Sequence, residues 1–250
     1  MRLNLLLALG CVIAFLLSLL AGRVWVPPAD WMSGDLGSII IVELRLPRAI
    51  LGLAIGGALG LSGAAMQGYL RNPLADPGLF GVSSSAALGA VCSLFFGFAA
   101  SAWLLPLFAL AGAAAGIMLL ALLAGRSASL ILFTLAGMIL ANLTASLTAL
   151  MISLAPTPFA ASEIMTWLMG ALTDRSWGEI RFALPIIAVG MALLATTARS
   201  LDALTLGEAA ARSLGVDTRR LQWLVVLGVG ACVGASVAAA GVVGFVGLIV

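Results

Sequence analysis

The chain has 250 residues, of which 63% are hydrophobic and only 9% are charged, and its mean hydropathy is +1.21. Soluble globular proteins carry about 25% charged residues, so the composition excludes that class and indicates a polytopic membrane protein. The net charge of +2 is too small to indicate nucleic-acid binding.

Seven stretches are apolar and long enough to cross a bilayer, whose hydrocarbon core of about 30 Å requires about 20 helical residues. In chain order they are roughly Leu3–Ala21, Pro47–Gln67, Ser83–Ala100, Trp103–Ala124, Leu130–Leu154, Phe182–Ala198 and Leu221–Ala240. The first also resembles a signal peptide, but the spans that follow favour an uncleaved helix. An eighth apolar run begins at Gly241 and no polar residue closes it, so we expect a longer protein truncated at its C-terminus. The sequence predicts an all-α transmembrane bundle, with one domain over residues 1–250.

The distribution of arginines favours a cytoplasmic N-terminus by the positive-inside rule. In that orientation seven arginines face the cytoplasm, namely Arg2, Arg71, Arg126, Arg199, Arg212, Arg219 and Arg220. The five that face outward are Arg23, Arg45, Arg48, Arg175 and Arg181.

The sequence lacks residues that metal binding, ion coupling and nucleotide binding usually require. Cys11, Cys92 and Cys232 stand apart in apolar runs without metal-type spacing, so no metal site is expected. No charged residue falls in the middle of a predicted span, although ion-coupled carriers usually hold one there. A nucleotide-binding P-loop needs a lysine, and the chain has none. Energy for uphill transport would therefore come from another subunit.

A charged insert at residues 204–220 separates the sixth and seventh predicted spans. Thr205 and Glu208 match a T-x-x-E capping box, which predicts the start of a helix. Glu208 and Arg212 have the spacing of a helical ion pair, and Gly215 is placed to end the helix in a left-handed conformation. The alanine-rich surface favours a slim knob that enters a groove on a partner. The alternative is an amphipathic helix on the lipid headgroups, but such helices typically carry Trp, Phe and Lys.

Arg45 and Arg48 lie at the outer end of the second predicted span. The planar guanidinium group pairs with carboxylates in a two-pronged geometry. The two arginines would therefore either dock an acidic partner outside the membrane or anchor the helix end.

Small polar residues follow one stripe of the fifth predicted span, at Asn142, Ser146 and Ser153. Such a stripe would line a translocation path, or it would join neighbouring helices by hydrogen bonds. Gln67, at the cytoplasmic end of the second span, admits the same two interpretations.

Four segments together resemble the FecCD family, the membrane permeases of bacterial ABC importers for iron-siderophores, haem and vitamin B12. They are LRLPRAILGLAIGGALGLSGAAMQGYLRNPLADPGLFGVSSSAALGA (Leu44–Ala90), WLMGAL (Trp167–Leu172), LTLGEAAARSLGV (Leu204–Val216) and GVVGFVGLIV (Gly241–Val250). The resemblance implies a type II importer in the inner membrane, with a homodimeric permease and its path at the dimer axis. It also implies about ten spans in a full family member, against seven or eight in this chain, and an inverted repeat that this chain holds only in part.

The resemblance assigns roles to the polar segments. The insert would be the coupling helix that sits in a cleft of a cytoplasmic ATPase, through Leu206, Gly207, Glu208, Ala211, Arg212, Leu214 and Gly215. Arg45 and Arg48 would receive acidic residues of a substrate-binding protein. The subunit itself would be no enzyme and bind no cofactor, since ATP and Mg²⁺ belong to the ATPase.

The substrate is not determined by any residue of the chain. An iron-siderophore is expected as the commonest cargo of such permeases, with haem and cobalamin as alternatives. An ion-coupled secondary carrier is the remote alternative, and a membrane scaffold that transports nothing is another.

Overall fold

The computed structural model describes residues 2–22, 24–32, 34, 36–98, 101, 103–124, 130–173, 175–244 and 246–248. Within these ranges the chain forms helices and turns and no strand, which confirms the predicted all-α fold. Arg23 and Arg126, which entered the orientation argument, lie outside the described residues.

The elements follow one another as a series of long helices joined by short ones. The long helices are α1 (Arg2–Leu20), α3 (Leu46–Leu70), α5 (Leu104–Ala124), α6 (Leu130–Ser153), α8 (Trp177–Leu204) and α10 (Thr218–Ala240). The short helices are α2 (Leu36–Ile39), α4 (Val82–Phe95), α7 (Pro158–Leu168) and α9 (Glu208–Ser213). A π-helical turn, η2 (Ile40–Arg45), joins α2 to α3, and the 3-10 turns are η1 (Pro28–Met32), η3 (Pro77–Phe80) and η5 (Val246–Leu248).

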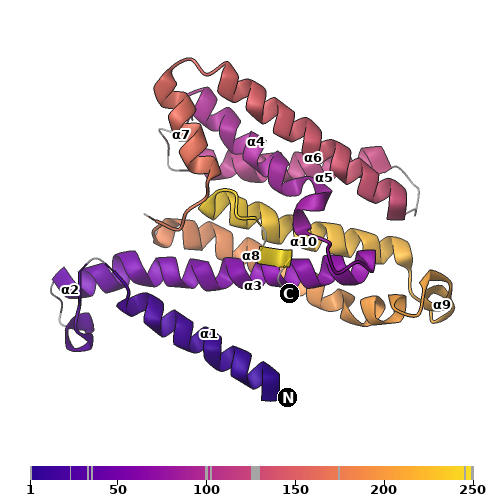
Figure 1. Cartoon of the computed structure of the whole chain (residues 1–250), viewed down its shortest axis with the longest axis horizontal. Coiled ribbons are helices and arrows are strands. Elements are labelled where there is room, and N and C mark those ends of the chain that lie inside the picture. The colour runs from indigo at the N-terminus through magenta and orange to yellow at the C-terminus, as the bar shows by residue number, and fades with distance from the viewer. Residues whose placement is uncertain are drawn as a thin grey trace.

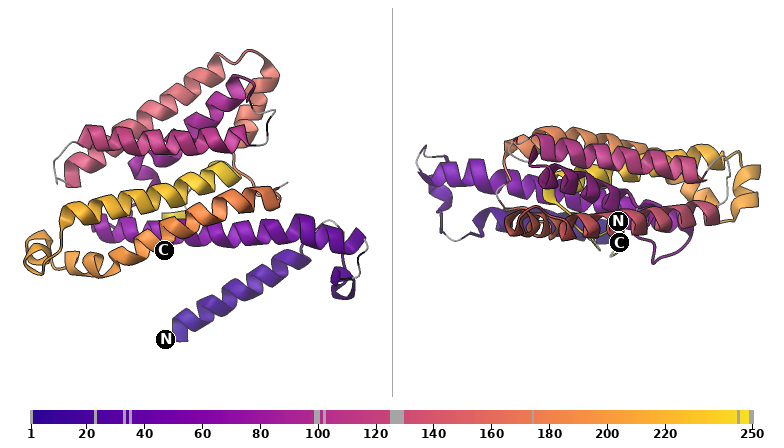
Figure 2. Two further views of the ribbon diagram at one scale, coloured as in Figure 1. Left: turned by 180° about the vertical axis from the view of Figure 1, so that it is seen from behind. Right: turned by 90° about the horizontal axis from the view of Figure 1, so that it is seen from above.

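Six helical stretches of the described chain are long and apolar enough to cross a membrane. They are Leu3–Leu20, Leu36–Leu70, Leu104–Leu123, Ile131–Ser153, Trp177–Leu204 and Thr218–Ala240. The bundle is layered around α10, because 78% of its apolar window is buried against 6% for that of α1. In Figures 1 and 2, α3, α8 and α10 run side by side through the middle, with α6 along one edge and α1 along the other.

The third predicted span, Ser83–Ala100, is wrong in its length. Helix α4 has 14 residues and ends at Phe95, so at 1.5 Å per residue it is about 21 Å long, too short to cross about 30 Å of hydrocarbon. It instead packs closely on α5. A Cβ on Gly89 would overlap the carbonyl group of Phe108, and one on Gly112 would overlap that of Ser85, so the small residues set this contact.

The eighth apolar run turns back into the bundle. Gly241 ends α10 with φ +76°, and η5 then packs against α3. The backbone N–H of Ala171 donates to the Ala240 carbonyl at 2.8 Å, and a Cβ on Gly170 would overlap the carbonyl of Val242. Within the described residues the run is therefore not the first turn of another spanning helix, because the close packing of these glycines bends it away from the axis of α10.

Candidate functional site

The charged insert forms a separate knob at one end of the bundle, opposite the end that holds α2 and α7 (Figure 1). Its helix α9 begins after Gly207, whose φ is +100° and which has no side chain to cap the helix. The predicted capping box at Thr205 is wrong, because α8 continues to Leu204 and takes Thr205 as its own C-cap. The Thr205 hydroxyl accordingly donates back to the Asp202 carbonyl at 2.6 Å.

The other local predictions for the insert are confirmed. Arg212 Nη2 donates to Glu208 Oε1 at 2.6 Å, one helical turn apart. Gly215 is left-handed, with φ +87°. The N–H groups of Gly215 and Val216 donate to the carbonyls of Arg212 and Ala211, each at 3.0 Å, which is the Schellman arrangement for ending a helix. The knob thus contains an internal ion pair and the residues that end its helix.

The knob presents apolar side chains outward. Leu206 is 68% exposed and Leu214 64% exposed, whereas Ala211 is fully buried in the core. Ala211 therefore attaches the knob to the bundle, and the two leucines with the exposed Ala209 form its outer surface. We call Leu206, Ala209 and Leu214 the knob surface. Exposed apolar side chains at the end of a membrane bundle are typical of a protein contact.

Arg45, at the opposite end, is turned inward. Its Nη1 donates to the backbone carbonyls of Leu19 at 2.9 Å and Leu20 at 3.1 Å, and its Nη2 donates to that of Val24. The residue is only 9% exposed. The last carbonyls of a helix lack intrahelical hydrogen-bond donors. The Arg45 guanidinium supplies such donors to the end of α1, and it thereby joins α1 to the start of α3.

Arg48 lies one turn further along and is exposed. The structure thus separates the two arginines that the sequence paired: Arg45 is held within the chain, and Arg48 is available to a partner. The π-helical turn between α2 and α3 is held from a second side, because Trp177 Nε1 donates to the Val42 carbonyl at 3.1 Å. Sequence reasoning missed Trp177, since its partner lies 135 positions away.

The predicted polar stripe of α6 faces away from the rest of the chain. Asn142, Ser146 and Ser153 are all exposed, and the Asn142 amide donates only to the Met138 carbonyl of its own helix, at 2.8 Å. The inner face of α6 is formed by other residues, which include the buried Phe133, Leu140, Thr144 and Thr148. The stripe therefore does not join helices within the described chain.

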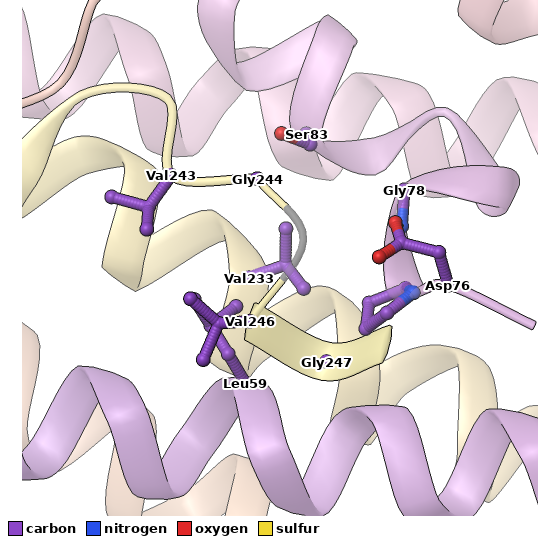
Figure 3. A pocket seen from close by; sticks show the side chains of 10 residues that line it. Leu59, Asp76, Gly78, Ser83, Val233, Val243, Gly244, Val246 and Gly247 are labelled. Carbon is purple, nitrogen blue, oxygen red and sulfur yellow. The ribbon is translucent and has the colours of Figure 1, made fainter. Parts of the chain in front are cut away.

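Gln67 lies against η5. Its Nε2 donates to the Gly247 carbonyl at 3.4 Å, and a Cβ on Gly63, one turn earlier, would overlap the same carbonyl. Beside this contact is a cavity of about 50 Å³, lined by Leu59, Asp76, Pro77, Gly78, Ser83, Val233, Val243, Gly244, Val246 and Gly247 (Figure 3). The Asp76 carboxylate accepts from the Gly78 N–H at 2.7 Å and so caps η3. Gln67 thus positions the C-terminal turn.

A bundle of this shape has a solved counterpart. The chain matches a structure described as a metal-chelate type ABC transporter in an inward-facing conformation, with a TM-score of 0.90 and 33% identity. The match covers 99% of this chain and 79% of that one. The fold and this similarity therefore define a membrane-spanning permease subunit of an ABC importer.

Sequence comparison gives the family. The model of the FecCD transport family matches residues 10–250. The vitamin B12 import system permease protein BtuC of Salmonella paratyphi A is 38% identical over 245 residues, which are 98% of this chain and 74% of that protein. The BtuC of Salmonella typhi is 37% identical with the same coverage. The chain belongs to the FecCD transport family and is a multi-pass protein of the bacterial inner membrane.

Proposed function

We propose that the chain is the permease half of an ATP-driven importer that carries a metal chelate into the cell. The observation that carries this function is the knob, a six-residue helix whose exposed leucines lie beyond the spanning helices. ATP binding closes the partner ATPase subunits, which push on the knob surface. Helices α8 and α10, between which the knob is inserted, then tilt and open the path on one side of the membrane.

The polar stripe of α6 supports a homodimer. Polar side chains rarely face lipid, and Asn142, Ser146 and Ser153 have no helix of the described chain over them. A second copy placed against α6 would cover this face and leave an aqueous path between the two stripes. Gln67 holds η5 beside the bundle core and has no part in that path.

The outer end receives the substrate-binding protein through Arg48. Arg48 is exposed on the first turn of α3, and the exposed Glu43 lies five positions earlier on the π-helical turn. A carboxylate of the binding protein would pair with Arg48 in the two-pronged geometry that arginine favours. Arg45 contributes by fixing the ends of α1 and α3 on which that surface stands.

Cobalamin is the substrate that the relatives favour. The BtuC proteins at 37–38% identity are named for vitamin B12 import, and the similar solved structure is described as of the metal-chelate type. Cobalamin and ferric siderophores are both large metal chelates, so the siderophore expected from sequence remains the second candidate. This subunit binds no nucleotide in the proposed mechanism, since ATP and Mg²⁺ are held by the ATPase.

The test is reconstitution of the chain with its ATPase and binding protein in proteoliposomes. Labelled cyanocobalamin and a labelled ferric siderophore are supplied outside, and ATP is enclosed. We expect ATP-dependent uptake of cobalamin and little uptake of the siderophore. Uptake that follows a proton or sodium gradient without the ATPase would identify a secondary carrier instead, and a complex that assembles without any uptake would identify a scaffold.

A further inference from the structure

A groove of about 460 Å³ lies where α8, the turn after α9 and the start of α10 meet. Leu193 and Leu224 supply part of its apolar floor, and its polar side chains are those of Thr196, Ser200, Asp217 and Arg220. Leu193, Thr196 and Ser200 share one face of α8, because residues three and four apart are neighbours on a helix.

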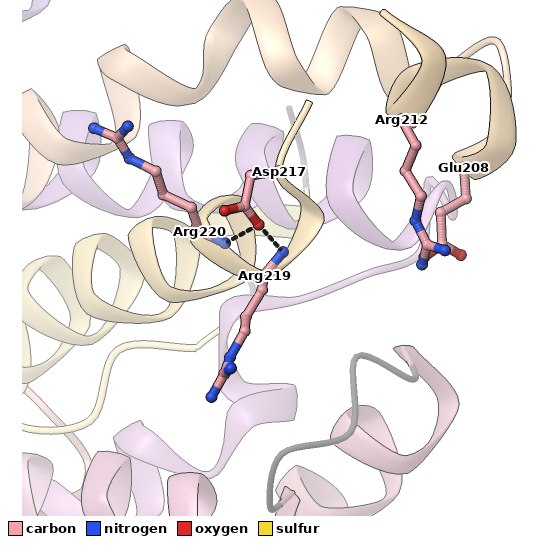
Figure 4. A network of polar contacts seen from close by, with 5 residues as sticks. All are labelled: Glu208, Arg212, Asp217, Arg219 and Arg220. Carbon is pink, nitrogen blue, oxygen red and sulfur yellow. Dashed lines mark hydrogen bonds and ion pairs between the residues drawn. The ribbon is translucent and has the colours of Figure 1, made fainter. Parts of the chain in front are cut away.

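The Arg220 guanidinium in this groove has no acidic partner among the described residues. The nearest carboxylate in sequence, that of Asp217, also lines the groove, and its Oδ1 accepts from the backbone N–H groups of Arg219 at 2.9 Å and Arg220 at 3.0 Å. Glu208 is paired with Arg212. Figure 4 shows the side chains of Arg219 and Arg220 diverging from Asp217, with that of Arg220 directed away from the knob. Asp217 is thus engaged by the backbone at the start of α10, and no described carboxylate forms an ion pair with the Arg220 guanidinium.

The groove also extends from the polar level of the bundle into its apolar part. The exposed Arg199 marks the polar level on α8, and Leu193 lies six residues before it, about 9 Å deeper at 1.5 Å per residue. On α10, Leu224 lies about 6 Å past Arg220. A ligand that pairs with Arg220 and fills the groove is accordingly anionic at one end and apolar at the other.

We propose that this groove binds an anionic phospholipid of the leaflet on the knob side. The phosphate is held by Arg220, the hydroxyl of Ser200 donates to the headgroup, and one acyl chain lies over Leu193 and Leu224. Basic pockets between spanning helices on the cytoplasmic side bind anionic headgroups in this way. A soluble ATPase fits less well, because the floor of the groove continues into the spans. The choice of leaflet rests on the proposed orientation of the importer.

The lipid would stabilise the α8–α10 junction from which the knob projects. Its phosphate bridges the two sides of that junction, Ser200 on α8 and Arg220 on α10, so a bound lipid would restrain the tilt of one helix against the other. This gives the inner-leaflet composition a direct influence on the movement that the ATPase drives.

The test compares Arg220→Gln with Arg219→Gln, a charge-matched control at the neighbouring exposed position outside the groove. The purified full chain is titrated with dioleoylphosphatidylglycerol, and binding is measured by native mass spectrometry. Wild type and Arg219→Gln should bind one tight lipid, and Arg220→Gln should bind it about tenfold more weakly, since a charge-assisted hydrogen bond is lost. Dioleoylphosphatidylcholine should bind weakly to all three.

Equal affinity of all three proteins for phosphatidylglycerol would overturn the proposal, as would equal binding of phosphatidylcholine. A second measurement adds the ATPase: if Arg220→Gln weakens ATPase association and leaves lipid binding intact, the groove belongs to the ATPase interface. Inorganic phosphate should not displace the lipid, because it cannot occupy the apolar floor. None of these outcomes changes ATP-dependent uptake by the wild type. Failure of the lipid proposal is therefore distinguishable from failure of the proposed function.

Discussion

The Arg45 guanidinium donates to the Leu19 carbonyl at 2.9 Å, and this bond joins the end of α1 to the start of α3. Burial of the arginine is tolerated because its charge faces the negative end of a helix dipole. The bond also explains the close approach at Gly22, where a Cβ would overlap the guanidinium group. The end of the bundle that holds α2 is thus built on an internal cap, and Arg48 is the arginine that remains exposed there.

Arg45→Gln is therefore predicted to destabilise the protein, by about 2 kcal/mol for the lost charged hydrogen bonds. The melting temperature in detergent should fall, and protease cleavage between α1 and α2 should become faster. Arg48→Gln is the matched control, which should keep the wild-type melting temperature and lose affinity for the binding protein. An unchanged melting temperature in Arg45→Gln would show that the cap contributes nothing.

Gly63 should tolerate no side chain. Its Cβ would overlap the Gly247 carbonyl, so Gly63→Ala must displace η5 and should cost about 1–3 kcal/mol of stability. Gly56→Ala lies two turns earlier on the same helix with open space around its Cβ, and it should be neutral. Thermal unfolding of the two variants checks this, and equal melting temperatures would contradict the packing of η5.

Exchange of the knob's two charges, by Glu208→Arg with Arg212→Glu, should uncouple ATP hydrolysis from transport. The pair would still form, but it would oppose the helix dipole and present reversed charges to the ATPase. We expect the amount of substrate carried per ATP to fall roughly tenfold, a common size for coupling between sites. The measurement is uptake and phosphate release in the same proteoliposomes, and an unchanged ratio would count against coupling through the knob.

Ser146→Cys should form a covalent dimer with a short bis-maleimide reagent, because we place Ser146 on the face that meets the second copy. Thr148→Cys on the buried face of the same helix is the control and should remain monomeric. Both variants are made after the exposed Cys11 has been replaced by serine. Failure of Ser146→Cys to crosslink in the assembled importer would argue against the proposed dimer axis.

Features determined by neighbouring residues were predictable from the sequence. The Glu208–Arg212 pair and the turn at Gly215 depend on residues within one or two helical turns, and both are confirmed. The spanning helices were predicted for a related reason, since the bilayer imposes one length on every helix that crosses it. Helix α4 is an exception, because it packs in the protein interior and does not need the length of a membrane-spanning helix.

Two other features were not predictable from a sequence pattern. The capping pattern at Thr205 was assigned to the wrong helix, because nothing local indicated that α8 continues through Asp202 to Leu204. The equivalent S-x-x-E pattern does form a capping box at Ser176 and Glu179, where α8 begins. The inward turn of Arg45 depends on carbonyl groups at least 21 positions away, and no local pattern encodes them.

The knob surface is proposed to contact a separate ATPase, and a crosslink from Ala209→Cys tests this contact most directly. Ala209 is exposed on α9, whereas Ala211 on the same helix is fully buried and provides the control. With a sulfhydryl-to-amine crosslinker, Ala209→Cys should join the ATPase with a yield that changes on ATP binding, and Ala211→Cys should not. If Ala209→Cys reaches no ATPase in the assembled transporter, the knob does not receive the work of ATP hydrolysis.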